Sequence, residues 1–283
     1  MGYQFITSER DGPVLVVTLN KPEKLNAYDA LMGDEIEDVF LAADLDDDIR
    51  AVVVTGAGRG FCAGVDISSG AQAFDATIDN PAFGQTEEGP RAGARFIRAI
   101  FTCSKPSIAA VNGAAVGVGA TMLLPFDFRL ASSTARISFV FTRRGLVLEA
   151  GSAWFLPKLV GIPTALRWCI GGNMIDAQEA LDRGLVGEVL EPEALLPRAL
   201  ELAQELTRDS APVAVALTRR MIWHYAGQLD PFELLDLDER LSIELGASPD
   251  LFEGMAAFEE RRTPAFPGRV SRDMPGNLPW SPR

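Results

Sequence analysis

Histidine is almost absent from this chain of 283 residues, which contains only His224. A metal site built from several histidines is therefore excluded, and any Ser-His-Asp triad would depend on His224 alone. Cysteine is also scarce and odd in number, with Cys62, Cys103 and Cys169. Cysteines this sparse do not form a disulfide framework, so we expect reduced thiols and a cytoplasmic location.

Basic residues are few relative to acidic ones: 26 Lys and Arg stand against 39 Asp and Glu, a net charge of −13. Nucleic acids and anionic membranes both require a basic face, so we expect neither as a partner. A small phosphate-bearing ligand is compatible with this net charge, because it needs only a local basic or backbone N–H site. The chain also lacks a membrane-spanning run of ~18 apolar residues, and its first residues lack the apolar region of a secretory signal.

Apolar runs rich in β-branched residues predict strands, and apolar residues spaced three and four apart predict helices. The predicted strands are 14–19, 51–55, 107–111, 127–130, 136–139 and 186–190; the predicted helices are 28–44 and 91–101, with a mostly helical pattern over 191–260. This order predicts an α/β fold: a core over 1–205, a helical region over 206–262 and an extended, Pro-rich tail over 263–283. Residues 68–90 lack periodicity and are predicted to form a mobile loop.

Two glycine-rich segments, 60–66 (GFCAGVD) and 112–119 (NGAAVGVG), follow predicted strands. Glycine lets backbone N–H groups approach a ligand, and a helix N-terminus adds partial positive charge. Two such loops would aim two N–H donors at one oxygen, which is an oxyanion hole. Taken singly, each loop also fits the plainer role of a tight turn or close helix packing.

Five segments carry a resemblance to a known family: NKPEKLNAYD, GRGFCAGVDI, KPSIAAVNGAAVGVGATMLLPFD, GLVLEAGSAWFLPKLVG and EGMAAFEERRTPAF. In order and spacing they are similar to the crotonase superfamily, the enoyl-CoA hydratases and isomerases, over roughly residues 5–266. The resemblance implies a spiral of ββα units whose C-terminal helices build a homotrimer or homohexamer. It also implies an acyl-CoA thioester as substrate, with coenzyme A as part of that substrate and no separate cofactor or metal.

By position, the resemblance puts the family's two oxyanion donors on the backbone N–H groups of Val65 and Val118. These groups would hold the thioester carbonyl oxygen while an enolate develops. The coenzyme A contacts that it implies are Lys24, Leu25, Ala63, Asp66, Ile67, Gly117, Phe258 and Arg261. Phe258, with Arg261 or Arg262, belongs to a C-terminal segment that often reaches coenzyme A in a neighbouring subunit.

Family hydratases use two glutamates, and here Thr121 and Phe141 occupy their positions. Glu149 instead resembles the single carboxylate of the family's Δ3,Δ2-enoyl-CoA isomerases. One carboxylate suffices to move a proton from C2 to C4, and apolar neighbours would raise its pKa to suit a base. The resemblance therefore favours isomerisation of 3-enoyl-CoA to 2-enoyl-CoA with Glu149 as the base.

Other interpretations of the same residues stay open. Glu149 would also fit as a carboxylate at a helix N-terminus, where free N–H groups attract negative charge. Hydration of 2-enoyl-CoA with a single carboxylate is a second enzymatic interpretation. A crotonase-fold protein that binds coenzyme A without catalysis is a third. Arg143 and Arg144 fit either a surface pair or a contact to a coenzyme A phosphate.

Further side chains have a plain structural interpretation. We expect Cys62 to be a small buried residue rather than a nucleophile, and His224 to be structural. Asp66 is expected to cap its loop or bind locally. For Met32 and Trp154 we expect ordinary core packing rather than a position lining the acyl pocket. Glu87 and Glu88 are expected to be solvated in the 68–90 loop. The segment 231–260 and the tail, with its apolar residues Phe266, Leu278 and Trp280, are expected to be partly buried between subunits.

Overall fold

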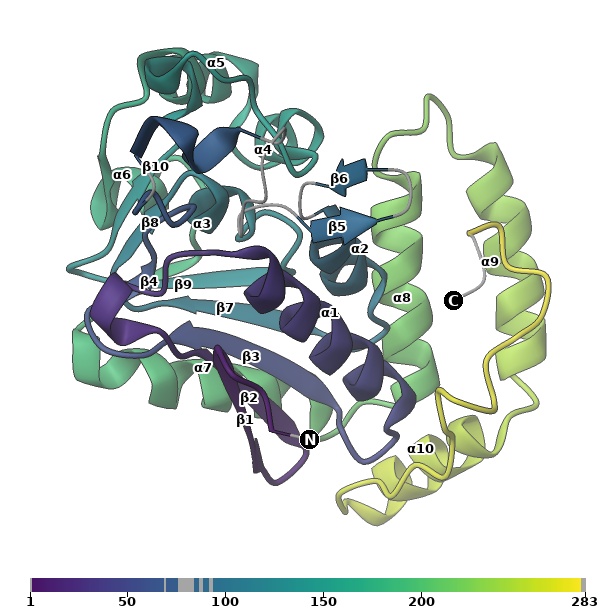
Figure 1. The fold of residues 1–283 in the computed structure, drawn as a ribbon. Coiled ribbons are helices and arrows are strands. Elements are labelled where there is room, and N and C mark those ends of the chain that lie inside the picture. Colours follow the sequence, from purple (N-terminus) through teal and green to yellow (C-terminus); the bar gives the residue numbers. More distant parts are fainter. Residues whose placement is uncertain (1, 69, 76–83, 87–88, 92–93, 281–283) are drawn as a thin grey trace.

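The computed structural model describes residues 2–68, 70–75, 84–86, 89–91 and 94–280 (Figure 1). The strands are β1 (Ile6–Asp11), β2 (Val14–Leu19), β3 (Ala51–Gly56), β4 (Gly60–Cys62), β5 (Gly84–Thr86), β6 (Gly89–Arg91), β7 (Ser107–Val111), β8 (Ala114–Val116), β9 (Phe128–Ser132), β10 (Arg136–Ser138), β11 (Ile175–Asp176) and β12 (Glu188–Leu190). They form a sheet of order β1-β2-β3-β7-β9-β12, a second sheet of order β11-β10-β8-β4, and the separate hairpin β5-β6. Both larger sheets are mainly parallel, which confirms the predicted α/β class.

The α-helices are α1 (Ala30–Leu45), α2 (Ala94–Thr102), α3 (Val118–Thr121), α4 (Ser152–Val160), α5 (Ile162–Gly171), α6 (Ala177–Asp182), α7 (Pro192–Thr207), α8 (Pro212–Tyr225), α9 (Phe232–Leu245) and α10 (Pro249–Glu260). Three short 3₁₀ helices are η1 (Pro22–Lys24), η2 (Gly70–Phe74) and η3 (Phe141–Arg144). Helices therefore cover both faces of the larger sheet, with α1 and α2 on one side and α7 on the other (Figure 1).

Strand β3 shows why an apolar run forms a central strand. All six of its residues are buried, and their side chains alternate between two cores. Val52 and Val54 pack in the core that contains α1 and α2, whereas Val53 packs against Leu195 and Ala199 of α7. A parallel strand covered by helices on both faces is buried along its whole length, so apolar residues are favoured at every position.

The predicted strands 14–19 and 107–111 coincide with β2 and β7. The sequence prediction missed β1, β4 and β8. In β1 only Ile6 is buried, while β4 and β8 have three residues each, too few to show a period. Within the predicted mobile loop 68–90, the described residues form η2, β5 and the start of β6, short elements that the sequence prediction did not include.

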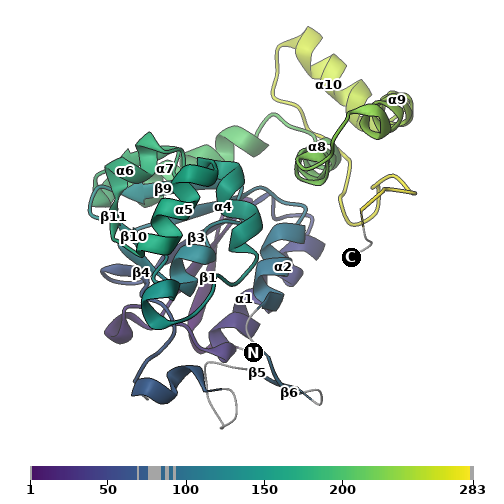
Figure 2. The same cartoon turned by 90° about the horizontal axis from the view of Figure 1, so that it is seen from above.

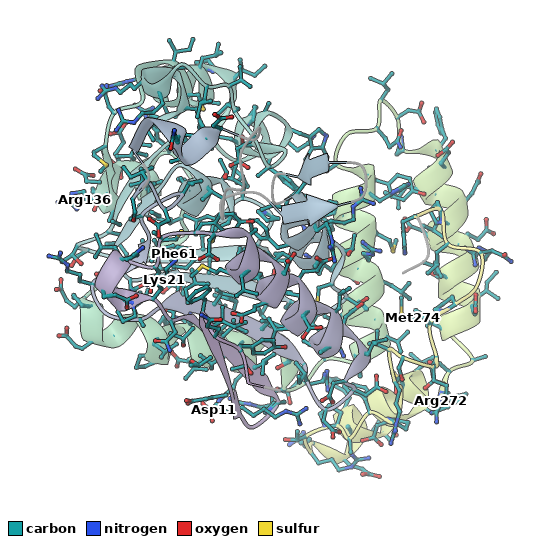
Figure 3. All side chains as sticks on the ribbon, in the orientation of Figure 1. Asp11, Lys21, Phe61, Arg136, Arg272 and Met274 are labelled. Atoms are coloured by element: carbon teal, nitrogen blue, oxygen red, sulfur yellow. The ribbon has the colours of Figure 1, made fainter. Side chains whose placement is uncertain are left out.

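Helices α8, α9 and α10, with residues 263–280, form a unit that stands off from the core, here called the helical arm (Figure 2). The described part of the tail contains no helix, as predicted. Leu278 and Trp280 pack against buried residues of α8 and α9 in the same chain, and their partial burial between subunits stays a prediction. Figure 3 shows Met274 of the same tail beside these helices.

Large apolar side chains remain exposed on α9 and α10, including Phe232, Ile243 and Phe252. A trimer or hexamer that covers them stays a prediction. The boundaries at residues 205 and 262 also stay predictions, although the chain turns from α7 into the helical arm between Thr207 and Pro212. Within the described residues, no helix is long and apolar enough to cross a membrane.

A buried ion pair joins the helical arm to the core. Arg219 of α8 donates from Nε to Asp127 at 2.7 Å, and Trp223 donates to the other carboxylate oxygen at 2.9 Å. Asp127 also accepts from the Ser107 N–H at the start of β7, at 2.9 Å. The side chains of Arg219 and Asp127 are 6% and 11% exposed, so little water screens the pair.

Replacing Arg219 by Met should therefore lower the free energy of unfolding by about 3–5 kcal/mol, because Asp127 would keep a buried charge without its cation. Urea denaturation measures this change. Arg272→Met is the matched control, since Arg272 pairs with Asp273 on the surface and should cost no more than about 1 kcal/mol. Equal effects of the two substitutions would show that Arg219 does not anchor the arm.

Candidate active site

The backbone of Val65 presents one N–H group to a cavity. Val65 follows β4, and an isolated parallel bridge pairs it with Tyr28. The Tyr28 N–H donates to Gly64 O at 2.8 Å, and the Asp66 N–H donates to Tyr28 O at 2.9 Å. Because successive N–H groups of an extended chain point to opposite sides, the Val65 N–H points away from Tyr28. Gly64 allows this turn with φ +103°.

The N–H of Val118 is the second candidate donor. Val118 is the first residue of α3, so its N–H has no acceptor within the helix. Gly119 brings α3 against the end of β4, because a Cβ at this position would lie 2.0 Å from the carbonyl oxygen of Cys62. Strands β4 and β8 are parallel neighbours, so the chain leaves both at the same edge of the sheet. Val65 and Val118 consequently line one cavity, of about 420 Å³.

The cavity combines charged residues with an apolar wall. Its lining residues are Lys24, Ala27, Ala63, Gly64, Val65, Asp66, Ile67, Ser68, Phe74, Val116, Gly117, Val118, Val140, Phe141, Arg144 and Leu146. The structure thus brings together the two predicted oxyanion positions and five of the predicted coenzyme A contacts, namely Lys24, Ala63, Asp66, Ile67 and Gly117. Leu25 does not line the cavity, but its carbonyl oxygen accepts from the Ala63 N–H at 3.0 Å.

Phe258 and Arg261 are not near this cavity within the chain. Phe258 lies in α10 with 81% of its surface exposed, and Arg261 follows at the end of the same helix. Both views show α10 on the far side of the molecule from β4 and α3 (Figures 1 and 2). Their predicted contact with coenzyme A therefore requires a neighbouring subunit and stays a prediction.

Glu149 lies next to Thr121, a residue of α3, and is not among the residues that line the cavity. The Thr121 hydroxyl donates to Glu149 Oε1 and lies 3.2 Å from the carbonyl oxygen of Val118. Burial raises the pKa of the Glu149 carboxyl above its ordinary value, and the bond from Thr121 lowers it in part. Thr121, at the position of one hydratase glutamate, thus donates its hydroxyl to Glu149. Phe141, at the position of the other, lines the cavity.

The interpretation of Glu149 as a helix cap finds no support in this geometry. Helix α4 begins after Gly151 and has no side-chain cap. The link to α4 runs through the backbone, where the Ser152 N–H donates to Glu149 O at 2.9 Å. Ala150 and Gly151 both have left-handed backbone conformations, with φ 55° and 70°, so the chain turns sharply directly after Glu149. This turn directs the carboxylate toward Thr121 rather than toward the free N–H groups of α4.

A lysine network occupies the mouth of the cavity. Lys24 donates to Asp66 at 2.6 Å, and the buried Lys21 lies 2.7 Å from Asp29 and 3.5 Å from Asp66. Bonds from Lys24 and Ser68 lower the pKa of the Asp66 carboxyl well below its ordinary value. Asp66 is therefore an ion-paired residue that holds Lys24 in place, as the expectation of local binding implies. Figure 3 labels Lys21, whose Nζ also lies 4.6 Å from the centre of the Phe5 ring.

The remaining candidates are structural. Cys62 is fully buried, and burial raises its thiol pKa to about 12, so it is not a nucleophile near neutral pH. His224 packs against Tyr225 and Trp280 in the helical arm. Trp154 packs against other aromatic rings and is 43% exposed. Met32 is fully buried in the core.

The two adjacent arginines have different roles. Arg143 donates to Gly171 O at 2.7 Å and also bonds the Asn173 side chain, whereas Arg144 lines the cavity. The sequence offered no means of separating these two arginines, because they are neighbours in the same short helix, η3. Glu87 and Glu88 lie outside the described residues. No group of three His, Cys, Asp or Glu within the described ranges is placed to hold a metal ion.

Asp66→Asn should lower the free energy of unfolding at pH 7 by about 1 kcal/mol, since the pair with the exposed Lys24 is lost. The folded-state pKa of Asp66 is lowered, so its contribution is complete above the unfolded pKa of about 3.9 and is lost as pH falls. The difference between wild type and variant should therefore shrink in urea titrations at pH 3. Asp34→Asn, at an exposed position of α1, is the control. An unchanged difference at pH 3 would contradict the ion pair.

Known proteins resemble this chain over most of its length. A profile of the enoyl-CoA hydratase/isomerase family matches residues 9–269. An enoyl-CoA hydratase of Alternaria alternata is 37% identical over 262 residues, 90% of this chain and 85% of that protein. A 1,2-epoxyphenylacetyl-CoA isomerase of Escherichia coli strain K12 is 33% identical over 272 residues, 94% of this chain and 99% of that protein. The crystal structure of a probable enoyl-CoA hydratase/isomerase from Mycobacterium abscessus has a TM-score of 0.82 and 32% identity, covering 93% of this chain and 99% of that chain.

Proposed function

The chain is an enzyme that belongs to the enoyl-CoA hydratase/isomerase family, and we propose that it converts 3-enoyl-CoA thioesters to 2-enoyl-CoA thioesters with Glu149 as the base. One observation carries this choice: Glu149 is a half-buried carboxylate that accepts a hydrogen bond from Thr121 of α3, the helix that begins at Val118. By the resemblance, Thr121 and Phe141 stand where a hydratase would have its glutamates.

In this proposal the thioester carbonyl oxygen accepts hydrogen bonds from the N–H groups of Val65 and Val118. Both donors belong to the backbone, so the valine side chains do not interfere. Negative charge grows on the oxygen as the enolate forms, and fixed donors stabilise that charge without having to reorient. Each such donor is worth ~2.7–4 kcal/mol of the barrier in enzymes of this kind.

Glu149 then moves one proton. Its carboxylate takes a proton from C2, the C2 electrons form a dienolate with the C3–C4 double bond, and Glu149 returns the same proton to C4 as the C2–C3 double bond forms. No atom is gained or lost, so one carboxylate completes the cycle. The raised pKa of Glu149 makes it a stronger base than an exposed glutamate and a competent acid for the return step.

The charged mouth of the cavity suits the coenzyme A portion of the substrate. Lys24 and Arg144 provide positive charge there, and Asp66 keeps Lys24 at the rim. We propose that these cations meet the phosphates, that Leu25 and Ala63 follow the pantetheine and adenine, and that Phe258 and Arg261 reach coenzyme A from a neighbouring subunit of a homotrimer or homohexamer.

Hydration of 2-enoyl-CoA is the second candidate, because several relatives are named enoyl-CoA hydratases. Hydration requires activation of a water molecule and protonation of C2, which the family's hydratases divide between two glutamates. Incubating the purified protein with 3-enoyl-CoA and 2-enoyl-CoA separately tells the reactions apart. Isomerisation leaves the product mass unchanged and alters the conjugation absorbance, whereas hydration adds the mass of one water.

Glu149→Gln should reduce turnover of 3-enoyl-CoA by ~10²–10⁴-fold and leave coenzyme A binding intact, because the amide keeps the shape of the side chain but cannot take a proton. Steady-state kinetics and calorimetric binding measure the two effects. Asp66→Asn is the control for the other carboxylate near the cavity and should keep turnover within a few-fold. Near-wild-type turnover in Glu149→Gln would sink the proposal.

Thr121→Val should shift the acidic limb of the pH–rate profile toward higher pH. The Thr121 hydroxyl stabilises the ionised carboxylate, so its removal raises the Glu149 pKa further, and the active, deprotonated form then appears only at higher pH. The loss of rate at pH 7 should be modest and should recover as pH increases. Thr121→Ser keeps the hydroxyl and should keep the wild-type profile, so an equal shift in both variants would contradict this role.

A further inference from the structure

Lys21 is a buried cation that the proposed mechanism does not use. Its side chain is 8% exposed, and its Nζ lies 2.7 Å from Asp29 Oδ2 and 3.5 Å from Asp66 Oδ2. A buried ion pair often stabilises a fold no better than apolar side chains of similar size do. Stability alone therefore does not explain a lysine at this position.

The backbone of Lys21 is tied to the start of β4 through Asn26. The Lys21 N–H donates to Asn26 Oδ1 at 2.8 Å, and the Asn26 N–H donates back to the Lys21 carbonyl oxygen at 2.9 Å. Asn26 is fully buried, and its Nδ2 donates to Gly60 O at 2.8 Å and to Ala57 O at 3.0 Å. The lysine side chain thus extends from a base that is fixed to the strand leading to Val65.

The two carboxylates that meet Lys21 flank the bridge between Tyr28 and Val65. Asp29 directly follows Tyr28, and Asp66 directly follows Val65. The Asp66 N–H donates to the Tyr28 carbonyl oxygen at 2.9 Å, which closes the bridge on that side. One ammonium group therefore joins the two bridged segments at neighbouring positions. The direction of the Val65 N–H depends on this bridge.

Without that cation, the two carboxylates would repel each other. The side chains of Asp29 and Asp66 are 9% and 19% exposed, so water screens the repulsion only weakly. Lys24 also pairs with Asp66, but the Lys24 side chain is 44% exposed and this pair is open to water. Asp29 is held in place, because its other oxygen accepts from the Met32 N–H at 2.9 Å and caps α1. The displacement would therefore fall on Asp66 and, with it, on the backbone of Val65.

We propose that Lys21 is a positioning residue of the oxyanion hole, which keeps the Val65 N–H aimed at the thioester carbonyl oxygen. It does so by neutralising Asp29 and Asp66 on either side of the bridge. This inference rests on the proposed function, in which that oxygen accepts hydrogen bonds from Val65 and Val118. Lys21 is not among the residues that line the cavity, so it acts through Val65 rather than on the substrate.

Lys21→Gln tests this role, because glutamine lacks the charge and its amide can still donate to Asp29. Infrared difference spectroscopy of bound hexanoyl-CoA, labelled with ¹³C at the thioester carbonyl, reports on the hydrogen bonds to that oxygen. Wild type should lower the stretching frequency below its value in buffer, and Lys21→Gln should return it toward that value. The kcat for 3-enoyl-CoA should fall by roughly 10–100-fold, less than the loss of about 10²–10³-fold for a whole donor. The dissociation constant of hexanoyl-CoA should change by no more than a few-fold, since the coenzyme A contacts remain.

Two further variants separate positioning from general stability. Combining Lys21→Gln with Asp66→Asn removes the repulsion and should restore most of the lowered frequency and of kcat, a non-additive result. Arg219→Met removes another buried cation, away from the cavity, and should leave the frequency and kcat unchanged despite its lower stability. Each variant is measured at a temperature at which circular dichroism shows it to be folded.

A wild-type frequency in Lys21→Gln, or an equal change in Arg219→Met, would overturn the role of Lys21. An unshifted stretch in wild type would overturn both the oxyanion positions and this role. The infrared measurement needs no turnover. A wild-type shift that Lys21→Gln reverses, in a protein that does not isomerise 3-enoyl-CoA, would therefore reject the isomerase reaction and still support the role of Lys21.

Discussion

The contact between the first turn of α3 and the end of β4 is the constraint on which the site depends. Gly119 lies against the carbonyl group of Cys62 so closely that no side chain fits between them. This backbone contact, together with the parallel pairing of β4 and β8, brings the Val65 and Val118 N–H groups to one cavity. The donors are thus positioned by the packing of main chains, which side-chain motion cannot disturb.

The polarity of the site changes from its mouth to its interior. Lys24 and Arg144 line the cavity and Asp66 pairs with Lys24, so an acidic chain with a net charge of −13 still has local positive charge for an anionic ligand. Glu149, which accepts a hydrogen bond from the Thr121 hydroxyl, is partly buried, and this burial raises the pKa of its carboxyl. Ion pairing lowers the pKa of the Asp66 carboxyl, whereas burial raises the pKa of the Glu149 carboxyl. The proposed mechanism uses only the one whose pKa is raised.

The helical arm is attached to the core by few but buried contacts. Arg219 and Trp223 of α8 meet Asp127, which is itself bonded to the first residue of β7. Helices α9 and α10 lie further out and expose apolar side chains (Figure 2). Trp223 of α8 packs against the core, whereas the cavity is lined by no residue of the arm and Phe258 of α10 is exposed.

The sequence by itself determined the α/β class, the strands β2, β3 and β7, and the two glycine loops, because β-branched runs and glycines act through local geometry. It also singled out Glu149 through a resemblance. It did not reveal β4 and β8, whose three residues become strands only through their neighbours. Only the tertiary structure decided that Thr121 bonds Glu149 across 28 positions and that Arg144 and not Arg143 lines the cavity. Such contacts depend on how distant loops close in space, which local pattern does not specify.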